Sequence, residues 1–270
     1  MLRSVPLVPT PVPCPPPTPR MLGDYLVVEK IAEGGFGEVY EAIAPCGRSV
    51  ALKVPLVNDE RALRDFQREV EIVRDLDHPN VVPILEADFI DGVPTIVYPL
   101  GDMSIAAIVD DGLWPAAGLE FSQQLLEGLA HVHQRGYLHC DLKPSNLIVL
   151  PGDTLGITDF GLARAQDDAH LHTTSGTADY MAPEHREDGR VSTRSDVYEA
   201  AVVIVEMLSG WVVTNPLELD LESALPRSRR LRALAPVLRR ALQLNPRARF
   251  LDGAAFAHAF RQVTRGASVH

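Results

Sequence analysis

The sequence predicts an α+β protein of two lobes, a small antiparallel sheet of five strands with one helix, followed by a larger and mainly helical lobe. Two observations support this division. Residues 21–98 contain short runs in which apolar and polar residues alternate, whereas apolar residues in 102–264 recur at helical spacings of three and four. Between the two patterns, Pro99-Leu100-Gly101-Asp102 breaks both and marks the connection.

The composition bounds the class of protein. The chain has 270 residues, of which 46% are hydrophobic, and this is enough for a sizeable core. A formal net charge of -11 disfavours binding to nucleic acid or anionic lipid, since both are polyanions. The three cysteines are far apart and form no CxxC pattern, which favours a reducing cytoplasm. No apolar run approaches the roughly 20 residues that span a bilayer, so we expect no membrane anchor.

Residues 1–20 form a proline-rich tail that we expect to be disordered. Each proline fixes φ and lacks an amide donor, which excludes helix and sheet in this segment. Pro6-Leu7-Val8-Pro9 has the PxxP spacing that an SH3-like groove can bind, although a featureless extension is the more common case.

The smaller lobe begins with strands predicted at 26–28, 39–43 and 50–54. Between the first two, Glu33-Gly34-Gly35-Phe36-Gly37 predicts a glycine-rich hairpin whose backbone amides can approach an anion without interference from Cβ atoms. Such hairpins are also common for purely steric reasons. Two further strands, at 84–90 and 93–98, complete the predicted sheet.

A lysine inside an apolar strand requires a partner. Lys53 lies in the strand predicted at 50–54, where an unpaired buried cation is costly. The amphipathic helix predicted at 60–75 carries Glu69 beside its apolar stripe, so we expect Glu69 to lean toward Lys53. The alternative is a lysine at a strand edge that extends to water.

The segment from Tyr137 to Val149 holds an acid, a cation and an amide at Asp141, Lys143 and Asn146. An aspartate can accept a hydroxyl proton, a lysine can offset charge on a moving phosphoryl group, and an asparagine can hold a divalent metal. Asp159 directly follows a short buried strand and is suited to place a carboxylate on Mg²⁺. These residue types together indicate phosphoryl transfer.

The larger lobe is predicted to contain helices at 119–135, 196–208, 231–242 and 253–263. The polar stretch 162–177 predicts a mobile loop. His131 and His133 are two residues apart on a helix and face different directions, so we expect packing or surface roles instead of a metal site. The arginines between 227 and 240 are interpreted as a solvated helix face, with a docking site for an acidic partner as the alternative.

In this order the motifs resemble the eukaryotic-type (Hanks-type) serine/threonine protein kinase family over residues 25–260. The resemblance implies a bilobal protein-kinase-like fold, with a kinase domain at 21–264, a small lobe at 21–98 and a large lobe at 102–264. It implies transfer of the γ-phosphoryl group of MgATP to serine or threonine hydroxyls of a protein. Lys143 and Thr177 are similar to the serine/threonine branch, and the short link from Gly210 to Leu231 is similar to bacterial members.

The resemblance also assigns roles. Asp141 is implied to be the catalytic base, assisted by Lys143. Lys53 and Glu69 are implied to form the ion pair that positions the nucleotide. Asn146 and Asp159 are implied metal ligands. The implied nucleotide contacts are Ile31, Ala32, Gly34, Gly37, Val39, Ala51, Lys53, Tyr98, Leu100, Asn146 and Asp159.

Three further residues have structural roles by the same resemblance. Glu184, in Ala182-Pro183-Glu184, is implied to pair with Arg249. Asp196 is implied to brace the catalytic loop, which is the loop that holds Asp141, Lys143 and Asn146.

Two positions depart from the family pattern. Ala32 stands where the first glycine of the phosphate loop is expected, a mild change because a methyl group is small. Cys140 replaces the arginine that usually precedes the catalytic aspartate and binds a phosphate on the activation loop. We therefore expect that phosphorylation of Thr173, Thr174 or Ser175 is not the main on-switch. A nearby lysine could make Cys140 a redox switch, but a buried structural cysteine is the more common case.

Two other functions compete with an active protein kinase. A pseudokinase would bind nucleotide or partners without chemistry, and such members usually lose at least one of the five residues Lys53, Glu69, Asp141, Asn146 and Asp159, all present here. A small-molecule phosphotransferase is disfavoured by the complete activation segment, which ends in Ala182-Pro183-Glu184 and serves peptide substrates in the resembled family. Protein substrates are the expected partners, with self-association for autophosphorylation as a further possibility.

Overall fold

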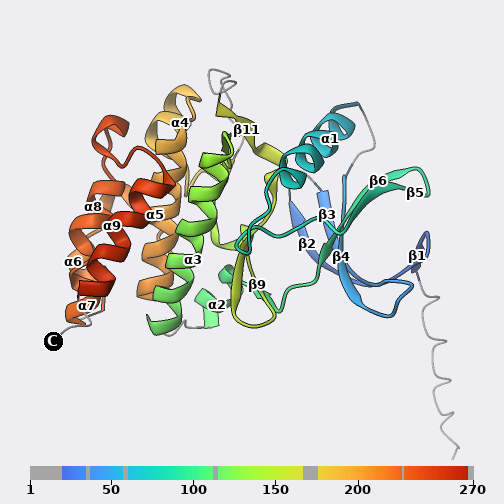
Figure 1. The fold of residues 1–270 in the computed structure, drawn as a ribbon, viewed down its shortest axis with the longest axis horizontal. Coiled ribbons are helices and arrows are strands. Elements are labelled where there is room, and N and C mark those ends of the chain that lie inside the picture. Colours follow the sequence, from blue (N-terminus) through green and yellow to red (C-terminus); the bar gives the residue numbers. More distant parts are fainter. Residues whose placement is uncertain are drawn as a thin grey trace, which may run out of the picture.

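The computed structural model describes residues 20–34, 37–56, 60–111, 115–166, 176–226 and 228–266. It has two lobes, a curled sheet flanked by helix α1 and a larger group of helices (Figure 1). The α+β bilobal architecture predicted from the sequence is confirmed. Residues 1–19 of the proline-rich tail lie outside the described residues, as does most of the predicted loop at 162–177.

The sheet of the smaller lobe is antiparallel throughout and has the strand order β1-β2-β3-β4-β6-β5. Its strands are β1 (Arg20–Leu22), β2 (Tyr25–Gly34), β3 (Gly37–Ile43), β4 (Ser49–Val54), β5 (Glu86–Ile90) and β6 (Val93–Pro99). The sequence predicted five strands, and β1 is the sixth. It forms because Gly23, at φ 53°, lets the chain reverse and its amide donates to Asp91 at 2.7 Å, so that Arg20 pairs with Val27.

Alternation along β4 divides the small lobe into two apolar layers. Val50 and Leu52 face one cluster with Tyr40 and Val97, whereas Ala51 faces a second cluster. Helix α1 (Glu60–Arg74) contributes Val70 to the second cluster, and its apolar stripe therefore covers that face of the sheet. Lys53 follows Leu52 in β4, so it lies on the same face as Ala51, and its side chain points from the sheet toward α1.

Short strands hold the loops between the lobes. The strands β7 (Met103–Ser104), β9 (Leu147–Leu150) and β10 (Thr154–Ile157) form one sheet, and β8 (Tyr137–Leu138) pairs with β11 (Arg164–Ala165). The 3₁₀ turns η1 (Pro144–Asn146) and η2 (Phe160–Leu162) adjoin β9 and follow β10. The loop that holds Asp141 and Asn146 therefore runs between the paired strands β8 and β9, and the loop that holds Asp159 runs between β10 and β11. The paired strands fix the positions of both loops.

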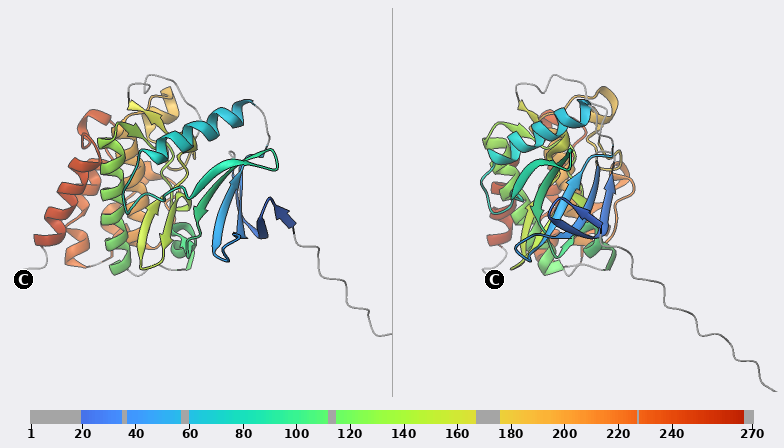
Figure 2. Two further views of the ribbon diagram at one scale, coloured as in Figure 1. Left: turned by 45° about the vertical axis from the view of Figure 1, so that its right-hand side comes forward. Right: turned by 90° about the vertical axis from the view of Figure 1, so that its right-hand side faces the viewer.

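The larger lobe packs around α5 (Thr193–Ser209), which is buried from Ser195 to Leu208. Its other helices are α2 (Ile105–Asp111), α3 (Pro115–Gln134), α4 (Pro183–Asp188), α6 (Leu221–Ala224), α7 (Arg229–Arg232), α8 (Ala235–Ala241) and α9 (Gly253–Gly266), with the 3₁₀ turns η4 (Pro216–Glu218) and η5 (Pro246–Ala248). The left view of Figure 2 places the small-lobe sheet and the α6–α9 group at opposite ends of the molecule.

One predicted helix is wrong. The periodic stretch 231–242 is two helices, α7 and α8, with a break at Ala233 and Leu234. Pro236 is the reason, because a proline is tolerated in the first turn of a helix but collides with the preceding turn in its interior. For the same reason Pro115 starts α3 four residues before the predicted helix.

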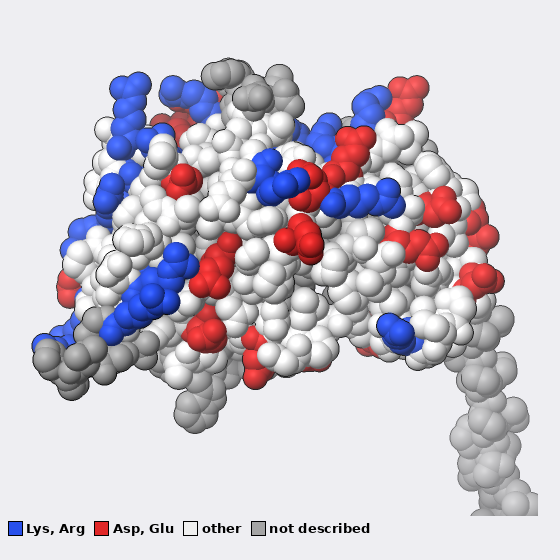
Figure 3. All heavy atoms as spheres, in the orientation of Figure 1, with Lys and Arg blue, Asp and Glu red and all other residues white. Residues whose placement is uncertain are grey.

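Of the arginines between 227 and 240, the four whose side chains the structure describes are exposed, which agrees with the interpretation as a solvated surface: Arg229, Arg232, Arg239 and Arg240. Arg227 and the side chain of Arg230 lie outside the described part. Arg239 is exposed and pairs with Glu222 at 3.0 Å, and the Arg240 guanidinium lies 4.3 Å from the ring centre of Phe250. Figure 3 shows lysine and arginine side chains over the helical lobe and many carboxylates over the sheet lobe. Within the described part of the chain, no helix has both the length and the apolar character needed to cross a membrane.

Candidate active site

Three elements bring a lysine and two carboxylates together between the lobes. Lys53 Nζ on β4 lies 2.6 Å from Glu69 Oε2 on α1 and 2.7 Å from Asp159 Oδ1 after β10. The lysine side chain is only 13% exposed, so the alternative of a strand-edge lysine extending to water is wrong. Burial alone would lower the pKa of Lys53, but Asp159 and Glu69 together raise it above its usual value.

The Tyr98 hydroxyl belongs to the same cluster. It donates to Glu69 Oε1 at 2.7 Å, and the ring is buried at the end of β6. Sequence reasoning placed Tyr98 beside the nucleotide but missed this hydrogen bond. A tyrosine that shares a buried glutamate with a lysine fixes the side chain of that glutamate, so the Lys53–Glu69 pair has a third support.

Asp159 has a left-handed backbone conformation with φ 63°, which aspartate tolerates better than most residues. Phe160 follows and is buried, and its ring centre lies 4.9 Å from that of His139 in a T-shaped arrangement. Burial raises the pKa of Asp159, but Lys53, with smaller contributions from His139 and Lys143, lowers it by more, so the net pKa lies below its usual value. Asp159 is therefore an ionised carboxylate, the chemical form that a divalent cation binds.

Asp141 is held from two sides of the loop. Its Oδ1 accepts the Thr177 amide at 2.8 Å, and its Oδ2 accepts Lys143 Nζ at 2.7 Å. Lys143 Nζ also donates to Thr177 Oγ1 at 2.9 Å, which joins the catalytic loop to the segment that begins at Gly176. The contact with Thr177 was not predicted, because the two residues are 36 positions apart in the chain.

Asn146 is buried in η1 beside Asp141. Its Nδ2 donates to the Asp141 carbonyl at 2.9 Å and approaches Asp141 Oδ2 at 3.3 Å. Only the oxygen of an amide has lone pairs for a metal, and the nitrogen is the atom turned toward Asp141. The donor set of Asn146 and Asp159, an amide oxygen and a carboxylate, fits Mg²⁺ that keeps further ligands from water and phosphate.

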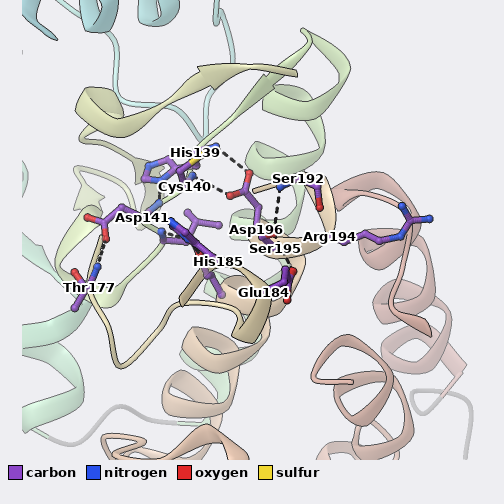
Figure 4. A network of polar contacts seen from close by, with 12 residues as sticks. His139, Cys140, Asp141, Thr177, Glu184, His185, Ser192, Arg194, Ser195 and Asp196 are labelled. Carbon is purple, nitrogen blue, oxygen red and sulfur yellow. Dashed lines mark hydrogen bonds and ion pairs between the residues drawn. The ribbon is translucent and has the colours of Figure 1, made fainter. Parts of the chain in front are cut away.

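Asp196 holds the base of the catalytic loop (Figure 4). It accepts the amides of His139 at 2.8 Å and Cys140 at 2.9 Å, and it lies 2.9 Å from His133 Nε2. His133 Nδ1 accepts the Gly253 amide, so its proton resides on Nε2 and is donated to Asp196. His133 is thus a structural residue, and His131 stacks on His78 at 4.9 Å, in agreement with the expected packing roles.

Glu184 and Arg249 form a buried bidentate pair with distances of 2.7 and 2.8 Å. The guanidinium also donates to the carbonyl oxygens of Gln243, Arg194 and Leu244, and it lies 4.8 Å from the Tyr198 ring centre. The pair expected from the family pattern is therefore present, and it fixes the end of the segment that starts at Gly176 to the residue directly after η5.

The small-lobe residues that the resemblance implies as nucleotide contacts lie on β2, β3, β4 and at the end of β6. Gly34 pairs with Gly37 across the hairpin, and a Cβ on Gly37 would come within 2.2 Å of the Val54 carbonyl oxygen. Val39, Ala51, Tyr98 and Leu100 share one apolar cluster. Ile31 and Ala32 are exposed on β2. The structure thus groups these residues, while the hairpin tip at 35–36 lies outside the described residues.

Cys140 is 1% exposed and has a left-handed backbone conformation with φ 66°. Burial, followed by the charges of Asp196 and Glu199, raises the pKa of the Cys140 thiol well above its usual value. The redox alternative required a nearby lysine to lower this pKa, and the opposite shift rules against it.

We expect iodoacetamide at about pH 8 to modify Cys46 and to leave Cys140 unmodified in the folded protein, because alkylation needs an accessible thiolate. Peptide mass spectrometry before and after unfolding measures both sites. Rapid native modification of Cys140 would show that the thiol is reactive.

A small antiparallel lobe over a helical lobe, with a lysine, two carboxylates and an asparagine at the junction, defines a protein kinase domain. The family model described as "Protein kinase domain" matches residues 25–225, and the chain belongs to this family.

Similar proteins agree with this assignment. The chain is 32% identical to serine/threonine-protein kinase PrkC of Bacillus subtilis, over 71% of this chain and 31% of that protein. It is 31% identical to serine/threonine-protein kinase PknD of Mycobacterium tuberculosis, over 94% and 42% of the two chains. It is 35% identical to serine/threonine-protein kinase 36 of Mus musculus, over 69% and 15%. The matches thus span less than half the length of each of these relatives.

Proposed function

We propose that this chain is a serine/threonine protein kinase that transfers the γ-phosphoryl group of MgATP to serine or threonine hydroxyls of proteins. The proposal rests on Asp141, whose carboxylate is held by Lys143 and Thr177, together with the paired Lys53 between the lobes. A general base must be oriented toward the hydroxyl that it deprotonates, and these bonds orient it.

The residues around ATP have separable roles. Lys53, oriented by Glu69, would bind phosphate oxygens, and the oxygens of Asn146 and Asp159 would hold Mg²⁺. Bound Mg²⁺ neutralises charge on the phosphates. Apolar walls for the base would come from the nucleotide contacts of the small lobe, namely Ile31, Ala32, Val39, Ala51 and Leu100. Asp141 accepts the proton of the attacking hydroxyl, and Lys143 offsets charge on the transferred group.

Two observations support protein hydroxyls as the acceptor. The Lys143–Thr177 hydrogen bond joins the catalytic loop to the start of the segment from Gly176 to Glu184, which faces the protein substrate in the family. The Glu184–Arg249 pair fixes the end of this segment. The relatives named above are serine/threonine-protein kinases. The pseudokinase alternative has no support in the structure, because the Lys53–Glu69 pair and the Asp141 contacts are both formed.

The direct test is incubation of the full chain with MgATP and a generic protein substrate, with phosphosites read by mass spectrometry. We expect phosphoserine or phosphothreonine with the unmodified protein and almost none with Lys53→Met, which retains an apolar stem but no ammonium. Absence of product from the unmodified protein, or equal product from Lys53→Met, would overturn the proposed function.

We further propose that the enzyme acts in the cytoplasm as part of a phosphorylation signal and that two copies associate transiently for autophosphorylation. The three unpatterned cysteines support the cytoplasm, and the net charge of -11 argues against nucleic acid as a partner. Mixing the active chain with a mass-tagged Asp141→Asn copy tests association, because phosphate on the inactive copy can arise only between molecules.

The absence of an arginine before Asp141 predicts that kinase activity does not depend on phosphorylation of the activation loop. Thr173, Thr174 and Ser175 lie outside the described residues, but Cys140 offers no cation for a phosphate on them. Replacing all three with alanine should therefore leave initial rates largely intact. The rate of peptide phosphorylation, compared between the triple variant and wild type, measures this, and loss of nearly all activity would contradict it.

A further inference from the structure

The catalytic loop contacts a second buried carboxylate on α5. Glu199 lies one helical turn after Asp196, and its Oε2 accepts the Leu142 amide at 3.1 Å. Asp196 accepts the two preceding amides, those of His139 and Cys140. The two carboxylates therefore hold amides on both sides of Asp141, and only Asp196 has a role in the family pattern stated above.

Glu199 has a buried basic partner. Its Oε1 lies 3.4 Å from His185 Nδ1 on α4, and the two side chains are 1% and 0% exposed. The His185 ring also packs against Gly176, since a Cβ on that glycine would lie 3.5 Å from His185 Cε1. Figure 4 shows His185 close to the loop of Cys140 and Asp141. The pair thus connects the catalytic loop, α5 and the segment from Gly176 to α4.

We propose that Glu199, paired with His185, is a second positioning carboxylate for the catalytic loop, and that its charge state sets how firmly the loop holds Asp141. The inference rests on the proposed kinase function for its kinetic readout. A carboxylate accepts a charge-assisted hydrogen bond from a backbone amide, and this bond is stronger than the one that a neutral acid accepts. Leu142 adjoins Asp141, so a looser amide at Leu142 displaces the base.

The surroundings place the titration of Glu199 near neutral pH. Burial, and next the charge of Asp196, raise the pKa of Glu199 to about 7 even though the hydrogen bond with His185 opposes the shift. Burial lowers the pKa of His185, but Glu199, Asp196 and Glu184 raise it, and the net shift is upward. The other titratable or charged groups near the pair are Cys140 in the loop, His133 and His139 against Asp196, and Arg249 against Glu184.

The sign of the pH effect follows. Above about pH 7 Glu199 is a carboxylate and holds Leu142 strongly, whereas below it the group is a neutral acid and holds Leu142 weakly. Turnover should therefore fall as pH decreases through this value. The ionisation of the nucleotide phosphates also titrates here, but it contributes equally to every variant and cancels in a ratio of rates.

The test compares the full-length wild type with Glu199→Gln, which retains an acceptor for Leu142 but no charge. Near pH 8 we expect kcat about tenfold lower in the variant, with KM for ATP unchanged, and the two enzymes should converge near pH 6. His185→Phe removes the hydrogen bond that lowers the pKa of Glu199, so the midpoint of its profile should move to higher pH.

Two controls separate positioning from stability. Glu206→Gln changes another buried carboxylate of α5, one that binds Tyr180 and Val213, and should leave the shape of the pH profile unchanged. The thermal midpoint of Glu199→Gln at pH 8 should not fall below that of wild type by more than a few degrees, because the variant removes a buried charge that is costly to ionise.

Hydrogen exchange at the Leu142 amide supplies a readout that needs no kinase activity. Glu199→Ala should speed this exchange, whereas Glu206→Ala should not. A wild-type/Glu199→Gln ratio of kcat that stays constant between pH 6 and 8.5, or unchanged Leu142 exchange in Glu199→Ala, would overturn the inference. A wild type without phosphoryl transfer would remove the proposed function, and Leu142 exchange would still decide the role of Glu199.

Discussion

Asp141→Asn is expected to lower kcat for peptide phosphorylation by about 10²- to 10⁴-fold, the usual contribution of a positioned general base. The asparagine has almost the shape of the aspartate and can still accept the Thr177 amide, but it cannot take the hydroxyl proton. Nucleotide affinity should change little, because Lys53, Glu69 and Asp159 form their cluster without Asp141. Initial rates and nucleotide titration on the same preparations measure both quantities.

Asp153→Asn is the matched control for this substitution. Asp153 is exposed in the turn between β9 and β10 with φ 56°, a conformation that asparagine also tolerates. It should keep wild-type kcat and stability. An Asp141→Asn variant that retains more than about a tenth of the wild-type rate would show that another group accepts the proton.

Arg249→Met is expected to reduce the free energy of unfolding by about 3–5 kcal/mol, the range for breaking a buried ion pair. The Arg249 side chain is fully buried, and its loss leaves Glu184 without its cation and the carbonyl oxygens of Gln243, Arg194 and Leu244 without their donor. Urea unfolding of the two proteins, with the slopes compared as well as the midpoints, measures the difference.

Arg247→Met provides the reference. This arginine lies two residues earlier in η5 and is exposed, so its replacement should change stability by no more than about 0.5 kcal/mol. The double variant Glu184→Met/Arg249→Met should lose less stability than the sum of the single variants, because it leaves no lone buried charge. Additive losses would mean that the two side chains do not stabilise each other.

Local patterns were sufficient for much of the architecture. The alternation in β2, β3, β4 and β6 reflects a sheet with two different faces, and the stripe of α1 reflects a helix that covers one of them. These features depend on neighbours a few residues away. The helix predicted at 231–242 failed for a local reason as well, since the proline at its centre outweighs the apolar periodicity.

The sequence by itself determined which chemistry is present: a lysine in an apolar strand, a glutamate beside a helical stripe, and the acid, cation and amide of the catalytic loop. Only the tertiary structure decided the partners of these groups. The Asp141–Thr177, Tyr98–Glu69 and Leu142–Glu199 hydrogen bonds join residues 36, 29 and 57 positions apart. The reason is physical, because buried polar groups must find donors or acceptors, and which ones lie within about 3 Å depends on how the helices and strands pack.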